Sequence, residues 1–170
     1  MQLNFLKISE ETKGEFRKIA DILFNSYAIQ NSKSIYRLSE IEFYWKSPTH
    51  KDDSTYPRRY VNPSTGEWFF HYSGVDIALR NDEIQGYGGI LIRGIVDVNS
   101  GKKYKGPQVS AMVLFSGGDA FSDSFSTRLI EYKFPQAQTI NKIRVGLGEN
   151  ATKSGTDQFK YRFEINTDDN

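Results

Sequence analysis

Residues 35–45 read Ile-Tyr-Arg-Leu-Ser-Glu-Ile-Glu-Phe-Tyr-Trp, a pattern with a period of two. Such alternation predicts a strand, with the apolar residues from Ile41 onward on one face and Glu40, Glu42 and Tyr44 on the other. A carboxylate beside aromatic rings in a cleft can have a raised pKa and act as a general base. The alternative is that this face is simply solvated. The strand is therefore the first candidate for a functional site.

Local patterns on either side of this strand predict the remaining elements. Thr12 and Glu15 form a T-x-x-E capping box before apolar residues at helical spacing, so we expect a helix over 13–26. The polar run 31–34 is expected to end this element. A loop over about 46–66 is long enough, at roughly 20 residues, to be functional or disordered. Further strands are predicted over 67–72, 75–79, 89–98, 103–105, 142–147 and 159–165, and short helices within 107–134.

These elements and the composition predict one α+β domain over residues 1–170, with a strand-rich antiparallel core flanked by helices. The chain has 22 Lys+Arg, 21 Asp+Glu and no Cys, which excludes a disulfide scaffold, a thiolate zinc site and a cysteine nucleophile. A net charge of +1 means that any contact with nucleic acid must come from local basic patches. No apolar stretch approaches the roughly 20 residues of a membrane span, and the first residues do not resemble a signal peptide. We expect a cytoplasmic protein without a membrane partner.

Three further polar residues stand out. The chain has two histidines, His50 and His71, and their spacing is not that of a metal site, so no metal or other cofactor is expected. Arg93 lies inside the apolar run 90–98, where an unpaired buried charge would be very costly. A carboxylate on a neighbouring strand, such as that of Glu42, would pair with the charge of Arg93. We therefore expect Glu42 and Arg93 to lie on adjacent strands and to line one pocket.

A series of short motifs runs in a fixed order along the chain. They are Glu40-Ile41-Glu42-Phe43-Tyr44, His50, Arg58-Arg59-Tyr60, Pro63 to Gly74, Leu91-Ile92-Arg93-Gly94, Arg144-Val145-Gly146-Leu147 and Tyr161-Arg162-Phe163-Glu164-Ile165. In this order they resemble the alkyladenine (3-methyladenine) DNA glycosylases of the mammalian type. That family runs E-T-E-A-Y, a histidine, an arginine-containing stretch, P-G-x-x-Y-V-Y, L-L-R-A, R-I-G-I and W-R-F-Y-I. The chain looks like a divergent member, with the resemblance clearest over 35–166.

The resemblance implies a partial barrel and a hydrolytic mechanism. In that family a flipped alkylated purine stacks among aromatic side chains while a glutamate activates water for attack on the sugar C1′. Glu42 then corresponds to the general base and Arg93 to the residue that positions the water. The transition state of such a reaction is like an oxocarbenium ion, which a nearby carboxylate stabilises. The base must leave the helical stack to be reached.

The resemblance also implies which residues bind the substrate. The aromatic residues expected to bind the base are Tyr44, His50, Phe70 and His71, and those expected to contact DNA are Arg58, Arg59 and Tyr72. Tyr72 takes the place of the family's intercalating tyrosine, one residue further from Gly74. The partner would be duplex DNA with a damaged base, and the protein would act as a monomer.

Three functions are compatible with these residues. The first is a monofunctional, cofactor-free DNA N-glycosylase. The second is a non-enzymatic module that binds a planar ligand or a partner between Tyr44, His50 and Phe70. The third is a hydrolase of free nucleosides or other small N-glycosides. Basic clusters on the same face as the cleft would favour DNA over the other two.

Overall fold

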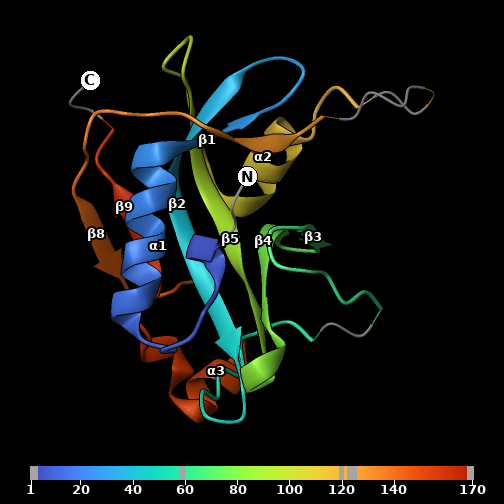
Figure 1. The fold of residues 1–170 in the computed structure, drawn as a ribbon, viewed down its shortest axis with the longest axis vertical. Coiled ribbons are helices and arrows are strands. Elements are labelled where there is room, and N and C mark those ends of the chain that lie inside the picture. The colour runs from blue at the N-terminus through green and yellow to red at the C-terminus, as the bar shows by residue number, and fades with distance from the viewer. Residues whose placement is uncertain (1–3, 58–59, 119–120, 122–125, 168–170) are drawn as a thin grey trace.

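The computed structural model of the chain describes residues 4–57, 60–118, 121 and 126–167. In this part of the chain, helices cover a curled, antiparallel half-barrel of nine strands (Figure 1). The strand order is β3-β4-β5-β2-β1-β7, with β6 added to β5, β9 to β2 and β8 to β9. The α+β class and the antiparallel core that the sequence predicts are confirmed.

The elements have the following bounds. The strands are β1 (Tyr27–Gln30), β2 (Ile35–Lys46), β3 (Trp68–His71), β4 (Gly74–Asn81), β5 (Gly86–Asp97), β6 (Lys103–Lys105), β7 (Arg128–Glu131), β8 (Thr139–Lys142) and β9 (Arg162–Ile165). The α-helices are α1 (Lys13–Ser26), α2 (Pro107–Leu114) and α3 (Glu149–Ser154). In the described residues, no helix combines the length and apolar composition needed to cross a membrane.

Strand β2 is the centre of the sheet, and its apolar face forms the core with α1. Ile41, Phe43 and Trp45 have no exposed surface, and the ring of Phe43 stacks on that of Phe16 at 5.0 Å between centroids. One edge of β2 pairs with β5 along nearly its whole length. The other edge pairs first with β1 and then with β9, and the register against β5 shifts around Glu40. The face of β2 opposite α1 is therefore left to the polar residues.

Helix α1 begins where the capping box predicts. The backbone N–H of Glu15 donates to Oγ1 of Thr12 at 3.1 Å. The carboxylate of Glu15 accepts backbone N–H bonds from Ser9, Glu10 and Glu11 at 2.8–3.0 Å, so it closes the preceding turn. One expectation here is wrong: the chain passes directly from α1 into β1, and the polar run 31–34 forms the turn between β1 and β2.

Two further expectations are corrected towards the C-terminus. Residues 107–114 form α2 as predicted, but 128–131 form β7, an edge strand beside β1, and not a helix. Of the predicted strand 142–147, only Lys142 belongs to a strand, because β8 ends at that residue. Residue Arg144 leaves the sheet because its guanidinium is bound to the buried carboxylate of Asp52.

Candidate functional site

The open face of the sheet brings together polar residues from three adjacent strands. Asp76 of β4 pairs with Leu91 of β5, and Leu91 pairs with Glu42 of β2. Tyr44 is two residues beyond Glu42 and lies on the same face, because alternate side chains of a strand point the same way. This is the face opposite α1, as the alternation in β2 predicts.

Glu42 and Arg93 lie on neighbouring strands, as expected, and form an ion pair, but neither is among the described residues that line the adjoining pocket. Nη1 of Arg93 is 3.4 Å from Oε2 of Glu42. Nε of Arg93 donates to Oε1 of Glu40 at 3.0 Å, so the guanidinium is held between two carboxylates. The hydroxyl of Tyr44 donates a short hydrogen bond to Oε1 of Glu42. Glu42 has no exposed surface.

Burial dominates the electrostatics of this cluster. It raises the pKa of Glu42, although the guanidinium of Arg93 acts in the opposite direction. Burial and the neighbouring Glu42 carboxylate raise the pKa of the Tyr44 phenol. Among the described residues, none donates a hydrogen bond to Oε2 of Glu42. This oxygen can therefore accept a proton without giving up an existing hydrogen bond.

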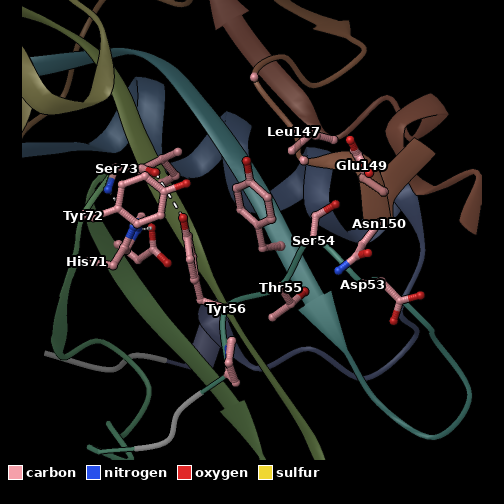
Figure 2. Close-up of a pocket in the computed structure, with 17 residues that line it drawn as sticks. Asp53, Ser54, Thr55, Tyr56, His71, Tyr72, Ser73, Leu147, Glu149 and Asn150 are labelled. Atoms are coloured by element: carbon pink, nitrogen blue, oxygen red, sulfur yellow. Dashed lines mark hydrogen bonds and ion pairs between the residues drawn. The ribbon is translucent and has the colours of Figure 1, made fainter. Parts of the chain in front are cut away.

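A pocket of about 420 Å³ lies directly beside the cluster. Tyr44 and Leu91 contribute to its lining from the sheet. The segment 146–151, which leads into α3, lines the opposite side (Figure 2). A volume of this size is within the range of about 300–1,000 Å³ found for small-ligand sites. The pocket is large enough for a bicyclic ring.

Aromatic side chains form the other wall of the pocket, as Figure 2 shows. The ring of Tyr56 is 4.6 Å from that of His71 and 5.6 Å from that of Tyr72, centroid to centroid. The hydroxyl of Tyr56 shares a hydrogen bond of 3.2 Å with Oγ of Ser73. Burial raises the pKa of Tyr56 to about 12, so this phenol is neutral at physiological pH. The wall offers ring faces on which a planar ligand can stack.

His71 is fixed by hydrogen bonds on both ring nitrogens. The backbone N–H of Ser73 donates to Nδ1 at 3.3 Å, which leaves the proton on Nε2. Nε2 then donates to Oδ1 of Asp76 at 2.9 Å. Both side chains are more than 90% buried. His71 therefore presents an immobile ring edge to the pocket.

The other sequence-predicted residues are placed as follows. His50 is bound through Nδ1 to the carbonyl oxygen of Trp45 (3.0 Å) and through Nε2 to the hydroxyl of Tyr161 (2.9 Å), and it is not one of the described residues that line the pocket. Nor is Phe70, which is 57% exposed and packs on Phe115. Tyr72 is 79% exposed at the rim of the pocket. Of the predicted cluster, the structure thus brings together Glu42, Arg93, Tyr44, His71 and Tyr72.

Two of the predicted DNA contacts, Arg58 and Arg59, lie outside the described residues. Sequence reasoning missed Tyr56 and Asp76. The signal for Asp76 was a single carboxylate inside the apolar strand 75–79, of the kind that singled out Arg93. Tyr56 had no such signal, because nothing in a polar loop shows which of its rings will face inward.

The described residues contain no group of three or more His, Asp or Glu side chains placed to hold a metal ion. Comparison with known protein families, with curated proteins and with solved structures finds no match for this chain. Its function is therefore inferred from the geometry of this site.

Proposed function

We propose that this protein is a divergent DNA N-glycosylase that takes a flipped, damaged purine into the aromatic pocket and hydrolyses its bond to the sugar. The observation that carries the proposal is the contact cluster of Glu42, Arg93 and Tyr44, of which Tyr44 lines that pocket. The cluster supplies a carboxylate, a cation and an aromatic ring. The order of motifs in the sequence supports the same assignment.

The chemistry follows from the atoms that are available. Water attacks C1′ of the sugar, and Oε2 of Glu42 accepts the proton that the water loses. The bond to the base breaks, and the base leaves with the bonding electron pair. Arg93, held through Nε by Glu40, keeps Nη1 directed at Glu42 and at the water. The carboxylate also stabilises the positive charge that develops on the sugar.

The pocket would hold the base by stacking. Tyr44, Tyr56 and Tyr72 each present ring surface, and stacking of a base on an aromatic side chain contributes roughly 1–3 kcal/mol. The carboxylate of Asp76, which also accepts a hydrogen bond from His71, places a polar group at the same wall. These are features that a purine, with its flat faces and polar edge, can use.

One observation favours a second function, a non-enzymatic module that binds a planar ligand. Glu42 is completely buried, and it is Tyr44 and Leu91, not Glu42, that line the pocket. Binding needs only the rings, whereas hydrolysis needs the carboxylate of Glu42 to become accessible to the sugar from the pocket. The two functions therefore differ in whether Glu42 ever meets the ligand.

The experiment that separates them is single-turnover release of base from alkylated duplex DNA. Glu42→Gln is nearly isosteric but cannot accept the proton, so release should fall by about 10²–10⁴-fold. Glu40→Gln is the matched control on the same strand, and it should cost much less because Glu40 accepts no proton in the proposed step and a Gln amide oxygen can still accept the hydrogen bond from Nε of Arg93. Full activity of Glu42→Gln would refute the mechanism. A wild-type protein that binds a purine but releases no base from any alkylated or deaminated duplex would favour the module.

A further inference from the structure

A second buried ion pair lies behind the pocket and is not used by the proposed chemistry. Nη1 and Nη2 of Arg144 donate to Oδ2 and Oδ1 of Asp52 at 2.6 and 3.0 Å. Neither side chain has any exposed surface. This is the two-pronged geometry that an arginine makes with a carboxylate and that a lysine cannot reproduce.

The pair joins two segments that line the pocket. Asp52 immediately precedes 53–57, and its Oδ1 accepts the backbone N–H of Ser54 at 3.1 Å. Arg144 precedes 146–151, and Figure 2 shows Asn150 of this segment beside Asp53, whereas Tyr56 lies across the pocket in the aromatic wall. Two segments far apart in the sequence are thus held at a fixed separation.

Arg144 also fixes the floor of the pocket. It donates to the carbonyl oxygen of Phe43 at 3.2 Å and to that of Thr156 at 2.7 Å. Its guanidinium carbon lies 4.9 Å from the centre of the Tyr44 ring, a cation–π distance. The Tyr44 hydroxyl is bound to Glu42, so the ring is held both at its face and at its tip.

Stability alone does not account for such a pair. Removing two charges from water is costly, and replacing a buried ion pair by apolar residues of similar volume is often neutral or stabilising. The pair therefore needs a role other than stability, and the geometry that it imposes on the pocket supplies one.

We propose that Arg144 and Asp52 are positioning residues that set the width of the pocket and the plane of Tyr44, and thereby select bicyclic over monocyclic rings. Between walls of fixed separation, a monocyclic ring leaves part of the lining without contact and loses the corresponding dispersion energy. A pocket free to adjust would close on either ring and discriminate less. The inference deepens the proposed function, since it rests on a planar ring binding in this pocket.

The test compares ring selectivity in a variant without the pair. Asp52→Leu with Arg144→Met removes both charges, and Lys142→Met with Glu164→Leu is the matched control, an ion pair between β8 and β9 away from the pocket. Binding of 2-aminopurine is followed by fluorescence, and cytosine is the competitor. Because the carbonyl oxygens of Phe43 and Thr156 lose their donor, we expect the first double variant to unfold at a somewhat lower urea concentration than wild type while remaining folded in buffer. Its affinity for 2-aminopurine should fall about tenfold, and its preference over cytosine should nearly vanish. Unchanged selectivity would overturn the proposal.

A second measurement does not depend on ligand binding or on the double variant folding. Arg144→Lys keeps the charge but loses the paired hydrogen bonds and the flat contact with Tyr44. In protein with ¹³C-labelled tyrosine, ring flipping of Tyr44 should be faster in Arg144→Lys than in wild type, while flipping of Tyr36 should not change. If wild type binds no purine but the flipping changes, the proposed function fails and the positioning role stands. Unchanged flipping of Tyr44 refutes the positioning role.

Discussion

At the scale of single residues, Glu42 shows two opposing effects on one carboxyl group. Complete burial favours the neutral form, while Arg93 at 3.4 Å favours the charged form. Burial has the larger effect, so the pKa of Glu42 is raised above its ordinary value of 4.5. A carboxyl group that holds its proton to a higher pH is suited to exchange a proton during a reaction. It also makes the stability of the fold depend on pH.

This dependence can be measured with Glu42→Gln. A carboxyl group with a raised pKa binds its proton more tightly in the folded state than in the unfolded chain, so its contribution to stability is present below about pH 4.5 and is lost as the pH rises through the folded pKa. Gln does not titrate. The free energy of unfolding of Glu42→Gln minus that of wild type should therefore increase from about pH 4 to about pH 8 in urea titrations. A constant difference would mean that the pKa of Glu42 is the same in the folded and the unfolded chain.

Tyr44 acts through its ring and its hydroxyl, and two substitutions separate them. Tyr44→Phe keeps the stacking surface but removes the donor to Oε1 of Glu42, which should cost about 1–3 kcal/mol of stability. Tyr44→Ala also loses the stacking of a base, roughly 1–3 kcal/mol of affinity. In 2-aminopurine titrations, Tyr44→Phe should keep most of the affinity and Tyr44→Ala should lose it. Tyr60→Phe, at a 97% exposed position, is the control. Equal losses in the two Tyr44 variants would indicate a hydrogen bond from the phenol to the ligand.

At the scale of elements, the site depends on close contact between β2, β4 and β5, which glycines permit. A Cβ atom on Gly88 would lie 1.9 Å from the carbonyl oxygen of Tyr44, a backbone atom of the neighbouring strand. A Cβ atom on Gly89 would lie 2.5 Å from Oδ2 of Asp76, a side chain of the pocket wall. Gly88 and Gly89 are thus positions of close strand contact: Gly89 pairs with Tyr44 on the face that carries the site, whereas Gly88 pairs with the buried Trp45.

Substitution of these glycines should have graded effects. Gly88→Ala must separate β2 from β5, because the clash is with backbone, and should cost about 3 kcal/mol or more. Gly89→Ala should cost about 1–3 kcal/mol, since Asp76 can turn away, but it should break the Asp76–His71 bond. Gly148→Ala, with no atom within 4 Å, should stay within about 0.5 kcal/mol of wild type. Urea unfolding measures all three. A neutral Gly88→Ala would contradict the close strand contact.

Sequence reasoning succeeded where the chain has a long, regular period. Strand β2 and helix α1 each carry more than ten residues of consistent alternation or helical spacing, and both were predicted nearly to the residue. Strand β7 has only four residues, and its neighbour β1 pairs with it from about 100 residues away, so no local pattern specifies it. Arg144 was predicted inside a strand because local spacing cannot show its bond to Asp52. Hydrogen bonds to residues distant in the sequence likewise hold Tyr56 in the pocket wall, through Ser73, and His50 outside it, through Tyr161.

At the scale of the whole molecule, charge limits what the protein can do with DNA. The net charge is +1, and several cations are already paired with carboxylates. In the described residues these pairs include Lys7, Lys46, Arg80, Arg93, Lys142, Arg144 and Lys153. A phosphate group would have to compete with those carboxylates. With these pairs and a net charge of +1, the protein has little excess positive charge to offer DNA, and any specificity must come mainly from the pocket.

Binding to duplex DNA should accordingly be weak and should decrease as salt increases. Each phosphate that a Lys or Arg neutralises adds about 0.9 to the slope of log affinity against log salt. If Arg58 and Arg59 contact DNA, changing both to Ala should lower the slope by about two and weaken binding to any sequence alike. Lys7→Ala, which removes a cation already paired with Glu83, should leave the slope unchanged. Fluorescence anisotropy with a labelled duplex across a salt series measures both effects. Tight binding that does not respond to salt would show that the protein holds DNA by contacts other than phosphate neutralisation, and an unchanged slope after the double substitution would exclude Arg58 and Arg59 from the interface.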